Sequence, residues 1–275
     1  MSDWDSWIGR SEVRHDTLEP ARSQALTIAL GFGSGNEDHL PSLHHWLYFW
    51  DVRPPAGLGA DGHPARGDFL PPIPLPRRMW AGGRLRFLAP LKLGTPVHKT
   101  STILSISQKS GRSGELCFVT VGHQLFGADG LAIEEEQDLV YRPAASATVS
   151  VSGDDSEAAH DWDTGILPDP VLLFRYSALT MNGHRIHYDA PYAASVEHYP
   201  GLVVQGPLQA TLLLTEAERR RGLAATTFAF RGKAPAIEGR PLHLRGKQAD
   251  ARAEVWAQQA GQTTMTAEVG WEVCS

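Results

Sequence analysis

The side chains best suited to chemistry gather in one stretch, residues 174–193. Within it, His187 follows Asn182 by five residues. Imidazole titrates near neutral pH, so His187 can take up a proton and return it within one turnover. The Asn182 amide cannot accept a proton as a carboxylate could, but it can orient a water molecule or a carbonyl oxygen. The stretch therefore offers one clear acid–base group, to which His184 or Asp189 could add a second. The competing interpretation of His187 is a purely structural hydrogen bond.

Two helix starts are expected to position these groups. Asp189 precedes Ala-Pro-Tyr and is expected to cap a short helix, because its carboxylate can accept from the free N–H groups of the first turn. Gly206 and Pro207 open a longer helix that is expected to continue to Arg221. The Gly206 N–H then lies at the positive end of a helix dipole, where it can stabilise an oxyanion, although a helix-start glycine without a ligand is the alternative. The aromatic segment that begins at Phe174 is expected to be a strand or a turn.

The order of these parts resembles the MaoC-like (enoyl-CoA hydratase 2) branch of the hot-dog superfamily. The motif of that branch reads Asp-x-Asn-Pro-x-His-x-Asp-x-x-Tyr/Phe-Ala, followed by Val-x-His-Gly-x-Leu. The matching positions are His187, Asp189, Tyr192, Ala193, Gly206 and Leu208. Three positions depart from it: Asn182 stands at the family's Asp, His184 at its Asn and Arg185 at its Pro. These departures, with Pro-Ile-Pro-Leu-Pro-Arg-Arg-Met-Trp-Ala-Gly-Gly at 72–83, resemble the narrower group of hydroxyacyl-thioester dehydratases type 2 and mesaconyl-C4-CoA (3-methylfumaryl-CoA) and itaconyl-CoA hydratases.

The resemblance implies both a fold and a reaction. The fold is a double hot-dog of the α+β class, in which each of two tandem units wraps an antiparallel sheet around a central helix. The expected division is a non-catalytic N-terminal unit over 1–145, a linker over 146–166 and a catalytic C-terminal unit over 167–275. The reaction is the reversible addition of water to a short, branched, carboxylated enoyl-CoA, giving citramalyl-CoA. We expect His187, Asn182 and Gly206 to be its catalytic residues.

A carboxylated substrate needs a cationic partner. Arg185, Arg77 and Arg78 are the candidates, because a guanidinium can bind a carboxylate through two parallel hydrogen bonds. His184 and Tyr188 complete the expected substrate-binding set. No metal or cofactor is expected, since the CoA is part of the substrate.

The surrounding pattern supports two similar halves. Pro90, Gly94 and Pro96 recur 145 residues later as Pro235, Gly239 and Pro241. At the same offset Asn182 corresponds to Glu37 and His187 to Ser42, so the chemistry is assigned to the second half and the acyl or CoA channel to the first. The expected elements are a helix over 16–31, a long Pro- and Gly-rich loop over 53–83, and strands over 97–107, 116–126, 131–141, 223–232, 241–249, 250–259 and 263–273.

Composition limits the class of protein. The chain has 275 residues and a net charge of −6, which argues against a nucleic-acid partner held by phosphate contacts. It has two cysteines and no apolar stretch of the length that a membrane span needs, and its first residues are acidic, unlike a secretory signal. We expect a cytoplasmic protein that does not contact membranes, assembled as a homodimer or a higher homo-oligomer.

Three other functions stay open. One is a 3-hydroxyacyl-thioester dehydratase acting on fatty acyl chains, which share the reaction but lack the carboxylate. Another is a hot-dog acyl-CoA thioesterase, although such enzymes usually use a carboxylate to activate water and Asn182 is not one. The last is a non-catalytic module that binds acyl-CoA.

Overall fold

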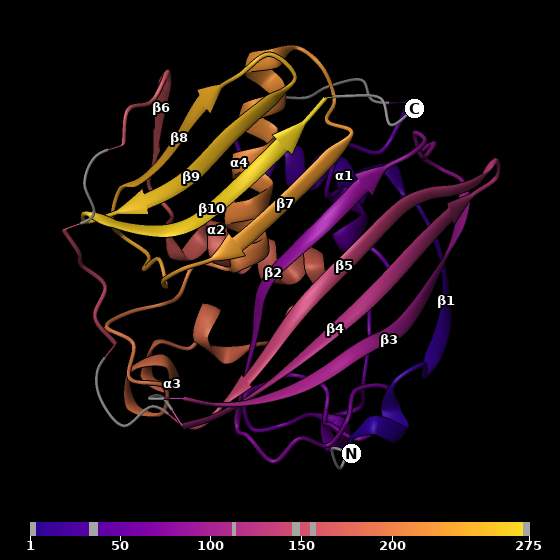
Figure 1. Ribbon diagram of the computed structural model, residues 1–275, viewed down its shortest axis with the longest axis vertical. Helices are drawn as coiled ribbons and strands as arrows, with labels where there is room; N and C mark the ends of the chain where they lie inside the picture. Colours follow the sequence, from indigo (N-terminus) through magenta and orange to yellow (C-terminus); the bar gives the residue numbers. More distant parts are fainter. Residues whose placement is uncertain (1–3, 33–37, 112–113, 145–148, 155–157, 272–275) are drawn as a thin grey trace.

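The computed structural model describes residues 4–32, 38–111, 114–144, 149–154 and 158–271. Within them, ten strands form one antiparallel sheet in the order β1-β3-β4-β5-β2-β7-β10-β9-β8-β6 (Figure 1). Glu37 and the expected unit boundary at 145/146 lie outside the described residues. No helix of the described chain is long and apolar enough to cross a membrane.

The sheet consists of two halves with the same internal order. The first half contains β1 (Ser11–Thr17), β2 (Arg77–Phe87), β3 (Pro96–Gly111), β4 (Gly114–Gly127) and β5 (Gly130–Arg142). The second contains β6 (Trp162–Ile166), β7 (Thr227–Gly232), β8 (Leu242–Gln248), β9 (Arg252–Gln259) and β10 (Gln262–Gly270). The order 1-3-4-5-2 in the first half reappears as 6-8-9-10-7 in the second, read from the outer edge inward. The two halves meet where β2 pairs with β7, so the sheet runs unbroken between them.

The sequence offset corresponds to equivalent turns. Gly94 and Gly239 both have positive φ, 79° and 72°. The Gly94 N–H donates to the Leu18 carbonyl and the Gly239 N–H to the Pro168 carbonyl, each at 2.7 Å. In both halves the accepting residue follows the outer strand, β1 or β6, and precedes a helix. The repeat seen in the sequence is therefore a structural repeat.

The halves differ in their helices. The second half has α2 (Pro170–Thr180), α3 (Ala190–Ser195) and α4 (Gly206–Arg221), and α4 lies along the face of β7 to β10 (Figure 1). The first half has α1 (Pro20–Ala29). Its described residues between α1 and β2 otherwise hold only the short 3-10 helices η2 (His44–Leu47) and η3 (Pro55–Gly57). The first half thus lacks a counterpart of α4 there, and a long loop takes that place. Two further 3-10 helices are η1 (Asp5–Trp7) and η4 (Arg185–His187).

Several expected elements are confirmed. The seven expected strands correspond to β3, β4, β5 and β7 to β10 and lie within a few residues of their expected bounds, and the hairpins at Gly127–Gly130 and Gln259–Gln262 form as expected. Asp189 caps α3, since its Oδ1 accepts from the Tyr192 N–H at 3.0 Å. The helix that begins at Gly206 and ends at Arg221 is also confirmed.

Other expectations are wrong. The segment at Phe174 is not a strand or turn but helix α2, which Asp169 caps through the Leu172 N–H and which has Pro170 in its first turn. The expected helix over 16–31 divides into the end of β1 and α1, because Pro20 fixes the backbone at the helix start. The last five residues of the expected linker form β6, which pairs with β8, and the final residues of the expected 53–83 loop belong to β2.

Candidate active site

A cavity of about 1080 Å³ lies between the two halves of the molecule. The second half contributes Asn182, His187 and Gly206 to its lining, and the first half contributes His63 and Arg78. Aromatic side chains from both halves, Trp46, Trp80 and Tyr176 among them, line its apolar parts. The expected catalytic residues therefore share one cavity with side chains that lie more than a hundred positions earlier in the chain.

His187 is held as a neutral proton acceptor. Its Nδ1 lies 2.7 Å from the Val203 carbonyl oxygen, and since a carbonyl can only accept, Nδ1 carries the proton and Nε2 keeps its lone pair. The side chain is buried, and burial lowers its pKa to about 4. His187 therefore meets two requirements of a general base at neutral pH: it is unprotonated, and one nitrogen is not committed to the backbone.

Asn182 lines the same cavity as His187. It follows Met181, which ends α2 in the left-handed conformation with φ 53°. The Asn182 Oδ1 accepts from the His184 N–H at 3.1 Å. With the oxygen engaged in its own turn, the amide nitrogen is the group that Asn182 can offer to a ligand, and it can only donate.

Gly206 begins α4 at the cavity wall. Its N–H belongs to the first turn of the helix, where backbone donors have no partner within the helix. A Cβ built at Gly206 would meet its nearest neighbour, the Trp80 carbonyl oxygen, only at 3.9 Å. The protein itself thus leaves space at this position. The preceding Gln205 fixes the helix start by donating to the Leu173 carbonyl at 2.9 Å and to Ser177 Oγ at 3.0 Å.

The three candidate arginines have different surroundings. Arg185 is engaged by Asp189, at 2.8 and 3.0 Å, and by the Ala60 carbonyl, and it does not line the cavity. Arg77 lines the cavity but is paired with the buried Glu197 at 2.5 Å. Arg78 also lines the cavity, and among the described residues no carboxylate is recorded within ion-pair distance of it.

The remaining predicted substrate-binding residues divide in the same way. Tyr188 is 48% exposed, donates its hydroxyl to the Gly183 carbonyl at 3.0 Å and does not line the cavity. His184 is buried and lines the cavity, with its ring centroid 5.4 Å from that of His187. Burial lowers the pKa of His184, and the neighbouring imidazoles lower it further.

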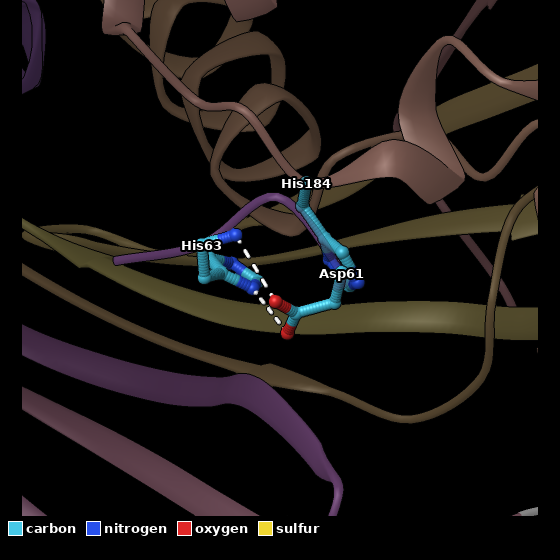
Figure 2. A group of neighbouring side chains, drawn as sticks. All are labelled: Asp61, His63 and His184. Atoms are coloured by element: carbon cyan, nitrogen blue, oxygen red, sulfur yellow. Dashed lines mark hydrogen bonds and ion pairs between the residues drawn. The ribbon is translucent and has the colours of Figure 1, made fainter. Parts of the chain in front are cut away.

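Two residues that the sequence analysis did not single out lie beside His184. The ring centroid of His63 is 4.2 Å from that of His184, and His63 Nδ1 is 2.9 Å from Asp61 Oδ2 (Figure 2). Ligand atoms of Asp61, His63 and His184 all lie within 4.8 Å of one another. The Asp-Gly-His sequence of 61–63 was the only local signal for this pair. Nothing in the spacing of the chain relates it to a stretch that begins about 110 positions later.

Backbone contacts fix the loop of Asp61 and His63 in the cavity. The Arg185 N–H donates to the Asp61 carbonyl at 2.9 Å, and Arg185 Nη1 donates to the Ala60 carbonyl at 3.1 Å. Gly62 has φ +88°, and a Cβ there would lie 2.0 Å from the Gly183 carbonyl oxygen. The first half of the chain therefore contacts the stretch of Asn182 and His187 in the second half and adds two polar side chains to the candidate site.

Comparison with known proteins identifies the family of this chain. The profile of hydroxyacyl-thioester dehydratase type 2 matches residues 43–238, which include both the loop of His63 and the stretch of His187. The chain belongs to the hydroxyacyl-thioester dehydratase type 2 family. It is 45% identical, over 98% of each chain, to the mesaconyl-C4-CoA hydratase of Chloroflexus aurantiacus. It is also 29% identical to the mitochondrial hydroxyacyl-thioester dehydratase type 2 of Schizosaccharomyces pombe, over 85% of this chain and 86% of the relative.

Solved structures agree on the fold of this family member. A MaoC-like dehydratase superposes with a TM-score of 0.72 at 14% identity, covering 98% of this chain and 99% of the other. A Mycobacterium tuberculosis protein with a double hot-dog fold superposes with a TM-score of 0.58 at 16% identity, covering 95% of each chain. The expected double hot-dog is confirmed, and so is the expected enzyme class, a hydro-lyase of the hydratase and dehydratase type.

Proposed function

We propose that this enzyme adds water reversibly to mesaconyl-C4-CoA, giving citramalyl-CoA. The observation that carries the proposal is the presence, in one cavity, of a neutral imidazole, a fixed amide donor and a guanidinium without a carboxylate partner among the described residues. The 45% identity to a mesaconyl-C4-CoA hydratase supports the choice of substrate. A cytoplasmic homo-oligomer that needs no cofactor besides the CoA of its substrate remains part of the proposal.

The water is the nucleophile. In the simplest scheme His187 Nε2 accepts a proton from water as the oxygen bonds to Cβ of the thioester. The electrons of the C=C bond move toward the thioester oxygen and form an enolate. The proton held by the imidazole then bonds to Cα, so the enzyme returns to its first state. A neutral His187 is required at the start, and its burial provides that state.

The enolate oxygen needs donors that are in place before the reaction. We assign this role to the Gly206 N–H at the start of α4 and to the Asn182 amide nitrogen, because both residues line the cavity with His187. Donors of this kind contribute roughly 3–4 kcal/mol each to the transition state of acyl-transfer enzymes. Asn in place of a carboxylate is suited to this role, because a negative charge beside an enolate would oppose its formation.

The substrate carboxylate decides which arginine is used. In mesaconyl-C4-CoA the carboxylate is bonded to Cβ, the carbon that receives water, so its partner must lie beside the histidines. Burial lowers the pKa of both His63 and His184, and the positive charge of Arg78 lowers it further. This charge effect, and the position of Arg78 in the lining of the same cavity, support Arg78 as the carboxylate partner. Arg78 is half-buried and lines the cavity, so its guanidinium can bind the substrate carboxylate through two parallel hydrogen bonds. We therefore assign carboxylate recognition to Arg78 rather than to Arg185 or Arg77.

One assay distinguishes this function from a thioesterase. The purified enzyme is incubated with mesaconyl-C4-CoA while the absorbance of the conjugated thioester and the release of free thiol are followed together. We expect the absorbance to fall with no thiol released. Thiol release at the same rate as the absorbance change would show a thioesterase, and CoA-thioester binding with neither change would show a binding module.

A further inference from the structure

The proton taken from water must reside on a group that tolerates a positive charge until Cα receives it. The simplest scheme leaves this proton on His187, but His187 is poorly suited to hold it. Its Nδ1 donates to a neutral carbonyl, and burial lowers its pKa to about 4. Among the described residues, the histidines paired with a carboxylate are His45, His63 and His243, and His187 is not one of them. Formation of an imidazolium there is therefore unfavourable, although accepting a hydrogen bond from water is not.

His63 has the partner that His187 lacks. Asp61 Oδ2 lies 2.9 Å from His63 Nδ1, and Asp61 Oδ1 accepts from the backbone N–H of His63 at 3.1 Å. Burial alone would raise the pKa of Asp61, but the hydrogen bonds and charge interaction with His63 outweigh it and lower the pKa. The carboxylate therefore stays ionised. It also fixes the tautomer of His63 with the proton on Nδ1, which leaves Nε2 as the acceptor.

Contacts with residues outside its own loop hold the Asp61–His63 pair in place. The Arg185 N–H holds the Asp61 carbonyl, and the backbone of Gly62 lies against that of Gly183. The ring centroid of His184 lies 4.2 Å from that of His63 and 5.4 Å from that of His187, and Figure 2 shows Asp61 and His63 next to His184. His63 and His187 both line the cavity.

We propose that His63, oriented by Asp61, is a second catalytic residue of the hydratase and is the group that carries the proton. This inference rests on the proposed function. A water O–H bond breaks, the proton moves to His63 Nε2, and the oxygen bonds to Cβ while His187 Nε2 orients the same water as a hydrogen-bond acceptor. The His63 N–H bond then breaks as the Cα–H bond forms from the enolate. Asp61 keeps its negative charge throughout and balances the imidazolium. The pair supplies from the first half the carboxylate function that Asn182 cannot provide.

The test compares His63→Ala and Asp61→Asn with a matched pair outside the cavity. His243 and Asp163 form the same contact, Nδ1 to Oδ1 at 3.0 Å, on strands β8 and β6, and neither lines the cavity. We expect His63→Ala to lower kcat for mesaconyl-C4-CoA about 100- to 10,000-fold with little change in KM or Tm. Asp61→Asn should cause a smaller loss in the same direction. His243→Ala should keep wild-type kcat.

Two further readouts separate a catalytic role from a structural one. Added imidazole should restore part of the activity of His63→Ala and none of that of Asp61→Asn. The charged and titratable groups that face His63 are Asp61, His184, Arg78, Arg66 and His187. Only Asp61 among these raises the pKa of His63, so Asp61→Asn lowers it. Because the reaction needs neutral His63, the acid limb of kcat/KM should then move to lower pH.

Each result of these experiments either supports the catalytic role of His63 or overturns it. A His63→Ala variant that is folded and retains more than about a tenth of the wild-type kcat would overturn the proposal. If that variant unfolds, His63→Gln takes its place and must show the same loss. A stoichiometric metal in the purified protein, with activity lost on chelation and restored by the metal, would also overturn it, because Asp61, His63 and His184 would then be ligands. A wild-type protein without hydratase activity refutes the proposed function itself, whereas an active His63→Ala variant refutes only the role of His63.

Discussion

Gly62 and Gly183 lie backbone against backbone, although they belong to different halves of the chain. A Cβ at Gly62 would lie 2.0 Å from the Gly183 carbonyl oxygen, and one at Gly183 would lie 2.7 Å from the Gly62 carbonyl oxygen. Gly62 separates Asp61 from His63, and Gly183 separates Asn182 from His184. The contact therefore brings the polar groups of the two halves together, and any side chain at either position would separate them.

Gly62→Ala should displace the loop that carries Asp61 and His63. The new Cβ collides with backbone, which cannot move aside as a flexible side chain could, so Asp61 and His63 should leave their positions beside His184. Gly67→Ala is the matched control, because Gly67 lies in the same loop with φ +98° and has its nearest Cβ neighbour at 3.6 Å. Both variants carry the cost of alanine at positive φ, roughly 1–3 kcal/mol. Only Gly62→Ala should lose kcat, by roughly tenfold or more. Equal kcat in the two variants would contradict the positional role of the contact.

The pH profile should lack an acid limb at the ordinary pKa of histidine. Burial lowers the pKa of His187 to about 4 and also lowers that of His63. A base must be neutral to act, and a lowered pKa keeps it neutral to lower pH. We therefore expect kcat/KM to stay level from about pH 7 to about pH 5 and to fall below that. A decline centred near pH 6.5 would show that the active-site imidazoles are not desolvated in the working enzyme.

Arg78→Gln should reduce carboxylate selectivity. The KM for mesaconyl-C4-CoA should rise at least about tenfold, while crotonyl-CoA, which lacks the carboxylate, should be affected far less. Arg185→Gln is the control, because Arg185 is occupied by Asp189 and the Ala60 carbonyl and does not line the cavity. It should affect both substrates alike through the loop it holds. If Arg78→Gln also affected both substrates equally, carboxylate recognition by Arg78 would be wrong.

The second half of the chain should have no hydratase activity without the first half. Strand β2 pairs with β7, and the ring centroids of Trp80 and Phe230 lie 5.9 Å apart across this junction. A fragment of residues 158–275 would expose the β7 edge and would lack His63 and Arg78. We expect it to aggregate or to bind weakly without turnover, as measured by light scattering and the hydration assay. A soluble, monomeric and fully active fragment would refute the shared site.

Local signals predicted much of the fold. Gly206 with Pro207 predicts the start of α4, and the Asp189 carboxylate predicts the cap of α3. Gly94 and Gly239 indicate equivalent turns of the two halves. Each of these depends on the backbone preferences of residues close together in the sequence. The helix that contains Phe174 was not predicted, because its aromatic residues favour a strand. Asp169 and Pro170 before it are a helix-start signal of the same kind as Gly206 and Pro207.

The site was less accessible to sequence reasoning. Asn182 and His187 could be singled out because they are close together in the chain. The Asp61–His63 pair could not, because its approach to His184 depends on a backbone contact between distant glycines. The choice among the arginines also required the structure: Arg185 lies nearest to His187 in sequence, yet its guanidinium is engaged by Asp189, whereas Arg78 faces the cavity.

The most direct test of the account is the mass of the CoA thioester after incubation with mesaconyl-C4-CoA in ¹⁸O-labelled water. Wild-type enzyme should produce a thioester heavier by one water molecule, with the label in its new hydroxyl group. His187→Ala should form this product about 100- to 10,000-fold more slowly, while the exposed His39→Ala control keeps the wild-type rate. An unchanged thioester, or free CoA with the label in a carboxylate, would contradict the assignment of this cavity as a hydratase site.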